Sequence, residues 1–185
     1  AQKDGYRSRA AYKLKEIDEE LQLIRPGQVV VDLGAAPGGF LQIISKAVGP
    51  KGLAIGVDLV EIKPFGQPNV KLMVADVTTA DFARRLAEIT PKGIDVVTSD
   101  MAPKTTGIRA TDEARSHELC RIALQAAKDH LKPGGDFLTK VFMGGDFKEL
   151  ENDIRKSFQT TRVVRPEATR ERSFEVYIVG QGFKP

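Results

Sequence analysis

Residues 31–40 read Val31-Asp32-Leu33-Gly34-Ala35-Ala36-Pro37-Gly38-Gly39-Phe40, and this stretch decides the fold of the chain. It begins in a short β-branched run, Val29 to Leu33, which is typical of a buried parallel strand. A helix is predicted after the glycine turn, through about Val48. Gly34 and Gly38 lack a Cβ atom, so a ligand can approach the backbone there. In open α/β sheets, ligands bind beyond the strand ends at such a turn, so this stretch predicts a cofactor site.

The spacing of the glycines narrows the kind of ligand. It is not G-x-G-x-x-G, and no Lys follows Gly39 as a P-loop would require. A dinucleotide-dependent dehydrogenase and a P-loop nucleotide-binding protein are therefore disfavoured. Asp32 stands just before the turn, where a carboxylate suits the cationic amino group of an amino acid and does not suit a pyrophosphate.

Two further acidic residues stand at predicted strand ends. Asp58 ends the second strand, 58 − 38 = 20 residues beyond Gly38, where an acid commonly accepts hydrogen bonds from ribose hydroxyls. Asp76 ends the third strand, where it can accept from the amino group of an adenine. Together with Asp32, these acids predict an adenosine that carries an amino acid. The alternative is that each Asp caps a turn or a helix.

Helical and strand patterns alternate along the rest of the chain. Helices are predicted over 8–23, 79–89, 111–131 and 146–158, and strands over 53–57, 70–74, 94–98, 136–142, 160–164 and 175–179. Ser8 and Thr79 are predicted N-caps. The alternation predicts an α/β fold with a mostly parallel, doubly wound sheet, in one domain over residues 1–185. The last two strands have no helix between them, so we expect a hairpin that makes one strand antiparallel.

Composition excludes several classes of protein. The chain has 185 residues, of which 41% are hydrophobic and 29% charged, as in an ordinary globular domain. No apolar run is long enough to span a bilayer and no secretory signal peptide opens the chain, so we expect a cytoplasmic protein without a membrane segment. Cys120 is the only cysteine and there are two histidines, which argues against a disulfide and a zinc site, and we expect no metal. The net charge of +3 does not by itself indicate a nucleic-acid partner.

Five motifs follow one another in order from about residue 5 to the C-terminus. They are Arg7-Ser8-Arg9-Ala10-Ala11-Tyr12-Lys13-Leu14, the D-L-G-A-A-P-G-G loop, Ser99-Asp100-Met101-Ala102-Pro103, Lys140-Val141-Phe142 and Arg172-Ser173-Phe174-Glu175-Val176-Tyr177. Together they resemble the FtsJ/RrmJ family of RNA ribose 2′-O-methyltransferases. The resemblance implies a Rossmann-like fold and S-adenosyl-L-methionine as cofactor.

The resemblance also implies site residues. The family's Lys-Asp-Lys-Glu tetrad falls on Lys13, Asp100, Lys140 and Glu175, and its cofactor contacts fall on Gly38, Phe40, Asp58, Asp76 and Asp100. Asp32 and Gly34 are added as cofactor-binding residues from their place in the turn. Bacterial relatives have Trp where this chain has Phe40, which keeps an aromatic face but lacks the indole N–H.

The chemistry of the reaction explains these residue types. A methyl group on a sulfonium is already activated, so in-line placement and removal of the hydroxyl proton are what remain to be supplied. We expect Lys140 to be the general base or to orient the hydroxyl, and Asp100 to bridge the cofactor and Lys140. Glu175 is expected to position Lys140 or the ribose, and Lys13 to hold the hydroxyl or a phosphate. Taken singly, Lys13 and Glu175 can be solvated side chains and Asp100 a turn residue.

Basic residues crowd two segments, near the N-terminus and over 162–172. If Lys13 and Glu175 reach the active site, both segments flank it, and we expect Arg7, Arg9 and Arg170 to contact RNA. The alternative is solvated surface charge. The stretch from Pro103 to Asp112 is expected to be a lid or a substrate-contact loop.

The expected partner is ribosomal RNA within the large ribosomal subunit, with a uridine as the target by family resemblance and the enzyme a monomer. A tRNA ribose 2′-O-methyltransferase is the alternative within the class. A small-molecule methyltransferase would need neither the basic segments nor the tetrad. A non-catalytic RNA- or nucleotide-binding module would not need the intact tetrad.

Overall fold

The computed structural model describes residues 2–169 and 174–185. Its helices are α1 (Ala10–Leu21), α2 (Gly39–Val48), α3 (Ala80–Ile89), α4 (Arg109–His130) and α5 (Phe147–Ser157), with short 3-10 helices η1 (Gln2–Asp4) and η2 (Glu167–Thr169). Its strands are β1 (Val29–Leu33), β2 (Leu53–Asp58), β3 (Val70–Val74), β4 (Ile94–Ser99), β5 (Leu131–Phe142), β6 (Phe158–Val164) and β7 (Glu175–Phe183).

One seven-stranded sheet forms the middle layer, in the order β3-β2-β1-β4-β5-β7-β6. The strands β1 to β5 pair in parallel, and β7 pairs antiparallel with both β5 and β6, which confirms the predicted hairpin and the α/β fold. Chain order reverses at β1, which lies between β2 and β4. The turn after β1 is therefore at the switch point where open α/β sheets bind ligands.

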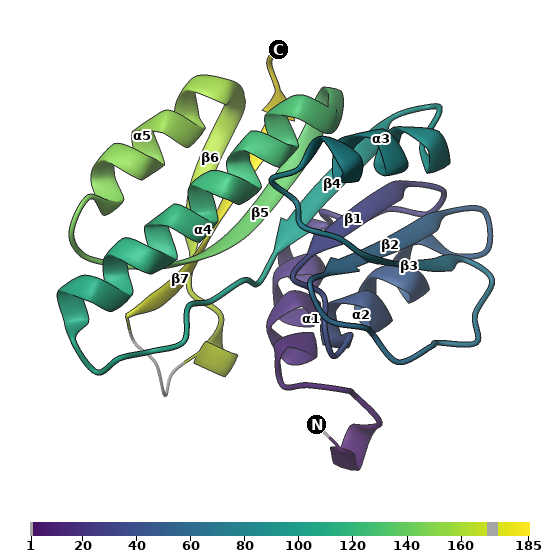
Figure 1. Cartoon of the computed structure of the whole chain (residues 1–185), viewed down its shortest axis with the longest axis horizontal. Coiled ribbons are helices and arrows are strands. Elements are labelled where there is room, and N and C mark those ends of the chain that lie inside the picture. Colours follow the sequence, from purple (N-terminus) through teal and green to yellow (C-terminus); the bar gives the residue numbers. More distant parts are fainter. Residues whose placement is uncertain (1, 170–173) are drawn as a thin grey trace.

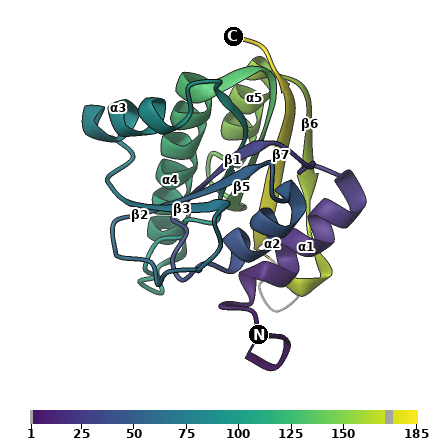
Figure 2. The same ribbon diagram turned by 90° about the vertical axis from the view of Figure 1, so that its right-hand side faces the viewer.

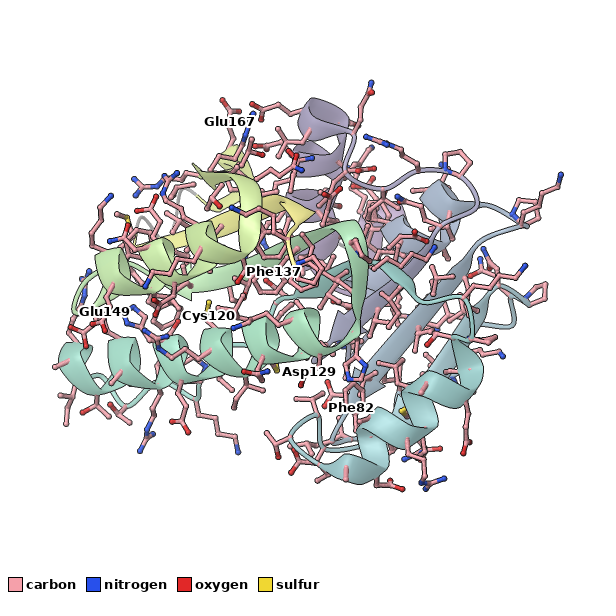
Figure 3. The ribbon with its side chains drawn as sticks, turned by 90° about the horizontal axis from the view of Figure 1, so that it is seen from above. Phe82, Cys120, Asp129, Phe137, Glu149 and Glu167 are labelled. Atoms are coloured by element: carbon pink, nitrogen blue, oxygen red, sulfur yellow. The ribbon has the colours of Figure 1, made fainter. Side chains whose placement is uncertain are left out.

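Helices cover both faces of the sheet. Figures 1 and 2 show α1 and α2 on one face and α3, α4 and α5 on the other. Each face has its own apolar core: Leu14 and Ile44 belong to the first, and Phe82 and Ile154 to the second. Cys120 of α4 lies in the second core (Figure 3), and burial raises the pKa of its thiol to about 12. A thiol so far from ionisation is no nucleophile near neutral pH.

The helix starts were predicted unevenly. Thr79 caps α3, since its Oγ1 accepts a 3.2 Å hydrogen bond from the N–H of Phe82, as expected. The prediction for Ser8 was wrong, because the residue before α1 is Arg9 and no side chain caps that helix. Helix α1 also ends at Leu21 and not at 23, because Gln22 takes a left-handed conformation with φ +50°.

Strand β5 is longer than expected. It was predicted to begin at Asp136, but it begins at Leu131, immediately after α4. Leu131 pairs with Ile94, and the register then shifts before Asp136 pairs with Val96. The Pro-Gly-Gly segment at 133–135 thus lies within an irregular part of the strand. Its composition is typical of a turn, which is why the strand was predicted to begin only after it.

Candidate active site

The four predicted catalytic side chains lie together at the carboxyl edge of the sheet. Nζ of Lys140 lies 3.5 Å from Oδ1 of Asp100 and 3.9 Å from Oε1 of Glu175. The other carboxylate oxygen of Glu175, Oε2, lies 3.6 Å from Nζ of Lys13. Two cations and two anions thus alternate in one cluster, and their opposite charges allow them to be buried together.

Each of the four comes from a different element. Lys13 is on α1, Asp100 directly follows β4, Lys140 is near the end of β5, and Glu175 is the first residue of β7. Because β7 runs antiparallel to β5, Glu175 pairs with Phe142 and enters at the edge where the parallel strands end. The side chains of Lys140 and Glu175 are only 9% and 2% exposed, and that of Lys13 is 16% exposed, so none is a solvated surface charge.

Tyr177 was not predicted as part of the site. Its hydroxyl donates a 2.5 Å hydrogen bond to Oδ1 of Asp100, and it pairs with Lys140 across the β5–β7 ladder. Burial, with the nearby Asp100 carboxylate adding to it, raises the pKa of Tyr177 well above its ordinary value, so the phenol stays a donor. The sequence could have indicated Tyr177, because it stands two residues after Glu175 on the same strand, and alternate residues of a strand face the same side.

Asp32 is buried beneath the glycine turn. It is 1% exposed, and Thr98 donates a 2.7 Å hydrogen bond to its Oδ1. Burial raises the pKa of Asp32 well above its ordinary value, the Thr98 hydroxyl opposes this, and the negative charges of Asp100 and Asp58 add to it. A cationic ligand group placed beside Asp32 would favour the ionised carboxylate.

Two cavities meet at Gly34. The larger, about 430 Å³, is lined by Asp58, Asp76 and Asp100, and the smaller, about 150 Å³, by Asp32, Phe40 and Asp100; both touch Gly34. A Cβ atom on Gly34 would lie 2.4 Å from Cγ of Met101, so only glycine fits. Paired cavities joined at a glycine, with carboxylates along both, fit a cofactor that has an adenosine half and a cationic amino-acid half.

Asp58 and Asp76 also organise their own turns. Asp58 accepts hydrogen bonds from the N–H groups of Ala36 (2.9 Å) and Val60 (3.2 Å). Oδ1 of Asp76 accepts from the hydroxyl (2.7 Å) and the N–H (2.9 Å) of Thr78, and these bonds lower the pKa of Asp76. Asp58 and Asp76 thus both stabilise their own turns and line the cavity. A role in capping a turn therefore does not exclude a role in binding the cofactor.

The predicted RNA-contact residues differ in their surroundings. Arg9 is exposed at the start of α1. The guanidinium of Arg7 donates to three backbone carbonyls within the chain, and its contact with RNA stays a prediction. Arg170 lies outside the described residues.

The loop before α4 is held by one carboxylate. Asp112 accepts from the N–H (2.8 Å) and hydroxyl (2.9 Å) of Thr106 and from the N–H of Gly107 (3.2 Å). Residues 104–110 are exposed around this turn. The loop therefore has a defined turn at its tip.

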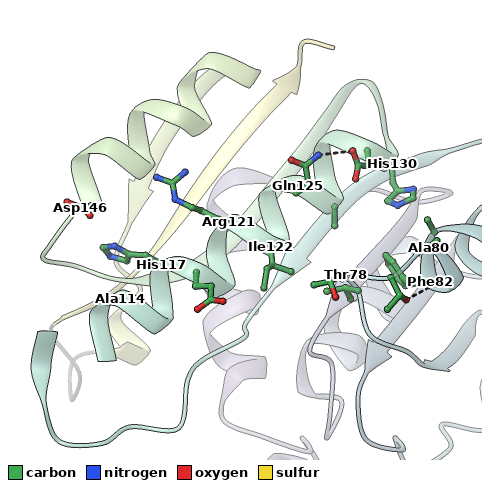
Figure 4. Close-up of a pocket in the computed structure, with 16 residues that line it drawn as sticks. Thr78, Ala80, Phe82, Ala114, His117, Arg121, Ile122, Gln125, His130 and Asp146 are labelled. Carbon is green, nitrogen blue, oxygen red and sulfur yellow. Dashed lines mark hydrogen bonds between the residues drawn. The ribbon is translucent and has the colours of Figure 1, made fainter. Parts of the chain in front are cut away.

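A cavity of about 760 Å³, larger than either of these two, lies apart from the tetrad, between the start of α3 and the length of α4 (Figure 4). It shares Val77, Thr78 and Ile122 with the 430 Å³ cavity, but none of the four clustered charged residues lines it. Size alone therefore does not locate the chemistry. Within 2–169 and 174–185, no helix could cross a membrane, and no three His, Cys, Asp or Glu side chains are grouped to hold a metal.

The chain is similar in sequence to known methyltransferases. A family model described as FtsJ-like methyltransferase matches residues 6–183. The Ribosomal RNA large subunit methyltransferase E of Myxococcus xanthus is 53% identical over 180 residues, covering 97% of this chain and 84% of that protein. The protein of the same name from Halorubrum lacusprofundi is 47% identical over 183 residues, covering 98% and 68%.

Solved structures share the fold. A Plasmodium falciparum protein assigned as a ribosomal RNA methyltransferase superimposes with a TM-score of 0.85 at 27% identity, covering 96% of this chain and 98% of that one. Aeropyrum pernix fibrillarin, solved with S-adenosyl-L-methionine, has a TM-score of 0.61 at 17% identity, covering 92% and 73%. The second likeness shows the fold alone.

Proposed function

Because the chain belongs to the FtsJ-like methyltransferase family and uses S-adenosyl-L-methionine, we propose that it methylates a ribose 2′-hydroxyl, that of a uridine, in large-subunit ribosomal RNA. One observation carries the chemical part of the proposal: Lys140 sits between the carboxylates of Asp100 and Glu175 beside the cofactor cavities. The names of the relatives support the choice of RNA. We place the enzyme in the cytoplasm, as a single-domain monomer acting on the large subunit.

The cofactor, when bound, supplies a methyl group on a positively charged sulfur. Asp58 and Asp76 would hold its adenosine half and Asp32 its amino group, with Gly34 and Phe40 in the surrounding wall. Gly38 lines neither cavity, so its proposed contact with the cofactor rests on the family resemblance alone. The carboxylate of Asp100 lines both cavities and also faces Lys140, so it connects the cofactor site with the reacting hydroxyl.

Methyl transfer forms a bond between the ribose oxygen and the methyl carbon, breaks the bond from that carbon to sulfur, and releases the hydroxyl proton. In our proposal Lys140 either orients the hydroxyl as an ammonium while the proton leaves to solvent, or first gives its own proton to solvent and then takes up the proton of the hydroxyl. Glu175 holds Lys140 from the opposite side to Asp100, and Lys13 contacts the ribose or a neighbouring phosphate. Placement of the reacting atoms supplies most of the acceleration, and proton transfer adds roughly 10²–10⁴-fold.

The surface around the tetrad suits a polyanion. Arg9 is exposed at the start of α1, the helix that carries Lys13, and Arg170 belongs to the connection that leads into Glu175. Arg9 and Arg170 would neutralise RNA phosphates, with binding that weakens as salt rises. A small-molecule methyltransferase would gain nothing from them.

The test is to incubate the protein and methyl-labelled cofactor separately with large and small ribosomal subunits, naked ribosomal RNA and tRNA. The label is then mapped by nuclease digestion and by resistance to alkali, because a methylated 2′-oxygen cannot attack the adjacent phosphate. We expect one labelled ribose, on a uridine of the large-subunit RNA. Label on a base would refute the 2′-hydroxyl target, and label on tRNA would support the alternative substrate.

A further inference from the structure

Arg7 lies outside the tetrad and fastens two segments to each other. Its Nη1 donates to the carbonyl oxygens of Pro37 (3.1 Å) and Lys63 (2.6 Å), and its Nη2 to that of Pro64 (2.9 Å). Its Cζ lies 3.7 Å from the ring centre of Phe65. The planar guanidinium thus links the glycine turn to the loop after β2, which lie 26 to 28 residues apart (63 − 37 and 65 − 37).

Asp58 bridges the same two segments from the cavity side. Its two carboxylate oxygens accept from the N–H groups of Ala36 in the turn and Val60 in the loop. Two charged side chains therefore hold the turn between the two cavities: the carboxylate of Asp58 accepts from the N–H of Ala36, and the guanidinium of Arg7 donates to the carbonyl of Pro37. Asp58 lines the cavity, whereas Arg7 holds the turn from outside.

The backbone of Arg7 is itself fixed. Its N–H donates a 2.7 Å hydrogen bond to Oε1 of Gln42 on α2, and Nε2 of Gln42 donates to the carbonyl of Gly5 (3.0 Å). On the turn, Gly38 has φ +122°, and a Cβ there would lie 2.8 Å from Cζ of Phe65 and 3.1 Å from Cδ of Arg7. The close approach at Gly38 shows that Arg7 and Phe65 pack directly against the turn that carries Pro37.

We propose that Arg7 is a positioning residue for S-adenosyl-L-methionine and not a contact to RNA. It acts by holding in place the wall of the 150 Å³ cavity, which would take the amino-acid half of the cofactor. Pro37, whose carbonyl Arg7 binds, lines that cavity together with Asp32 and Phe40. Because the wall is already ordered, no conformational entropy has to be lost to order it when the cofactor binds. For Arg9, which is two residues further on and exposed, we expect a contact to RNA and no effect on cofactor binding.

The test compares Arg7→Ala with the matched variant Arg9→Ala by two measurements. Calorimetry with S-adenosylhomocysteine, which needs neither RNA nor turnover, should show a Kd raised about tenfold for Arg7→Ala, since an ordered wall is lost, and unchanged for Arg9→Ala. The salt dependence of RNA binding should stay the same for Arg7→Ala. For Arg9→Ala its logarithmic slope should fall by about 0.7–0.9, as for one lost phosphate contact.

Further readouts separate positioning from general stability. Hydrogen exchange should quicken at residues 35–38 and 59–66 of Arg7→Ala and stay unchanged in β5 and β7. The KM for the cofactor should rise while kcat at saturation stays within about twofold, because no group at the reacting atoms is removed. Arg7→Lys should rescue only partly, because an ammonium lacks the planar fork and stacking surface.

If Arg7→Ala fails to fold, Phe65→Leu removes the stacked ring alone and should raise the same Kd by a smaller factor. An unchanged Kd for Arg7→Ala, with a salt slope reduced as for Arg9→Ala, would overturn the proposal and return Arg7 to the RNA surface. Failure of the chain to bind or methylate any RNA would count against the proposed function, and the calorimetric result would still decide the role of Arg7.

Discussion

Tyr177 donates a hydrogen bond of 2.5 Å to Oδ1 of Asp100, the same oxygen that lies 3.5 Å from Nζ of Lys140. One carboxylate oxygen thus receives a neutral donor from β7 and faces a cation from β5. The phenol fixes the orientation of Asp100 without adding charge, and so keeps the distance to Lys140 short.

Tyr177→Phe should slow methyl transfer. Hydrogen bonds to charged groups contribute about 1.5–3 kcal/mol, which corresponds to about a 10- to 100-fold lower single-turnover rate if the bond matters fully in the transition state. The ring and its packing are kept, so the chain should stay folded, with a melting temperature lowered by the loss of this one hydrogen bond. A single-turnover rate equal to that of the unmodified chain would exclude a positioning role for this hydroxyl.

Lys140→Ala should lower the methylation rate at least 100-fold and leave S-adenosylhomocysteine binding within about twofold. Lys140→Arg separates the two roles considered for this residue, because arginine keeps the charge but does not give up its proton. Partial activity of Lys140→Arg would indicate orientation, and an activity as low as that of Lys140→Ala would indicate proton transfer.

Lys132→Ala is the control for these variants. Lys132 lies near the opposite end of β5, where it pairs with Asp95 at 3.0 Å and is half-exposed. It should leave the rate unchanged, because nothing at the reacting edge contacts it. A comparable loss in Lys132→Ala would attribute the effect of Lys140→Ala to damage of the strand.

Asp32→Asn should stabilise the ligand-free protein at pH 7. Because burial raises the pKa of Asp32 in the folded chain, the folded state holds a proton at pH values where the unfolded chain has released it. Stability is therefore lost as pH rises above about 3.8, the unfolded value, and an amide avoids that loss. The melting temperature of Asp32→Asn should exceed that of the unmodified chain at pH 7 and approach it near pH 4, while cofactor affinity falls.

Asp76→Asn provides a control of opposite sign. Hydrogen bonds from Thr78 lower the pKa of Asp76, so its contribution to stability is present above the unfolded value and is lost on acidification. This variant should melt below the unmodified chain at pH 7, and the difference should shrink at low pH. If the melting temperature at pH 7 changed in the same direction for both variants, the environments assigned to Asp32 and Asp76 would be contradicted.

Asp112→Asn should loosen the loop before α4. The N–H of Thr106 is the first cause of a lowered pKa at Asp112, so the ionised carboxylate is the form that holds the turn. Hydrogen exchange at Thr106 and Gly107 should quicken, and RNA affinity should fall if this loop contacts substrate. Asp146→Asn is the control, because Asp146 precedes α5 without a side-chain cap hydrogen bond. Unchanged exchange in Asp112→Asn would show that the turn forms without the carboxylate.

The sequence predicted features that depend on local pattern. The alternation of β-branched runs with amphipathic segments was sufficient for the sheet and its hairpin, and the hydroxyl of Thr79 was recognised as a cap. Ser8 has the same kind of side chain but failed as a cap, because Arg9 already has helical angles of φ −66° and ψ −21°. Tertiary packing decides such ends, and a single sequence does not contain it.

The site was predicted from motifs, and motifs do not show contacts between distant segments. The structure brings Lys13, Asp100, Lys140 and Glu175 together as expected, and their roles stay predictions. Arg7 was assigned to RNA from its charge and neighbours alone, since its contacts with the carbonyls of Lys63 and Pro64 cross more than fifty residues. No spacing rule predicts a guanidinium bound by backbone carbonyls.

The antiparallel placement of β7 has a consequence for the connection that precedes it. Pairing of Val164 with Tyr177 and of Phe142 with Glu175 fixes both ends of the connection between β6 and β7, whatever its length. Connections generally tolerate insertion and substitution far better than the strands they join. This connection can therefore change in length or composition while the ladder keeps the carboxylate of Glu175 in register with the strand that carries Lys140.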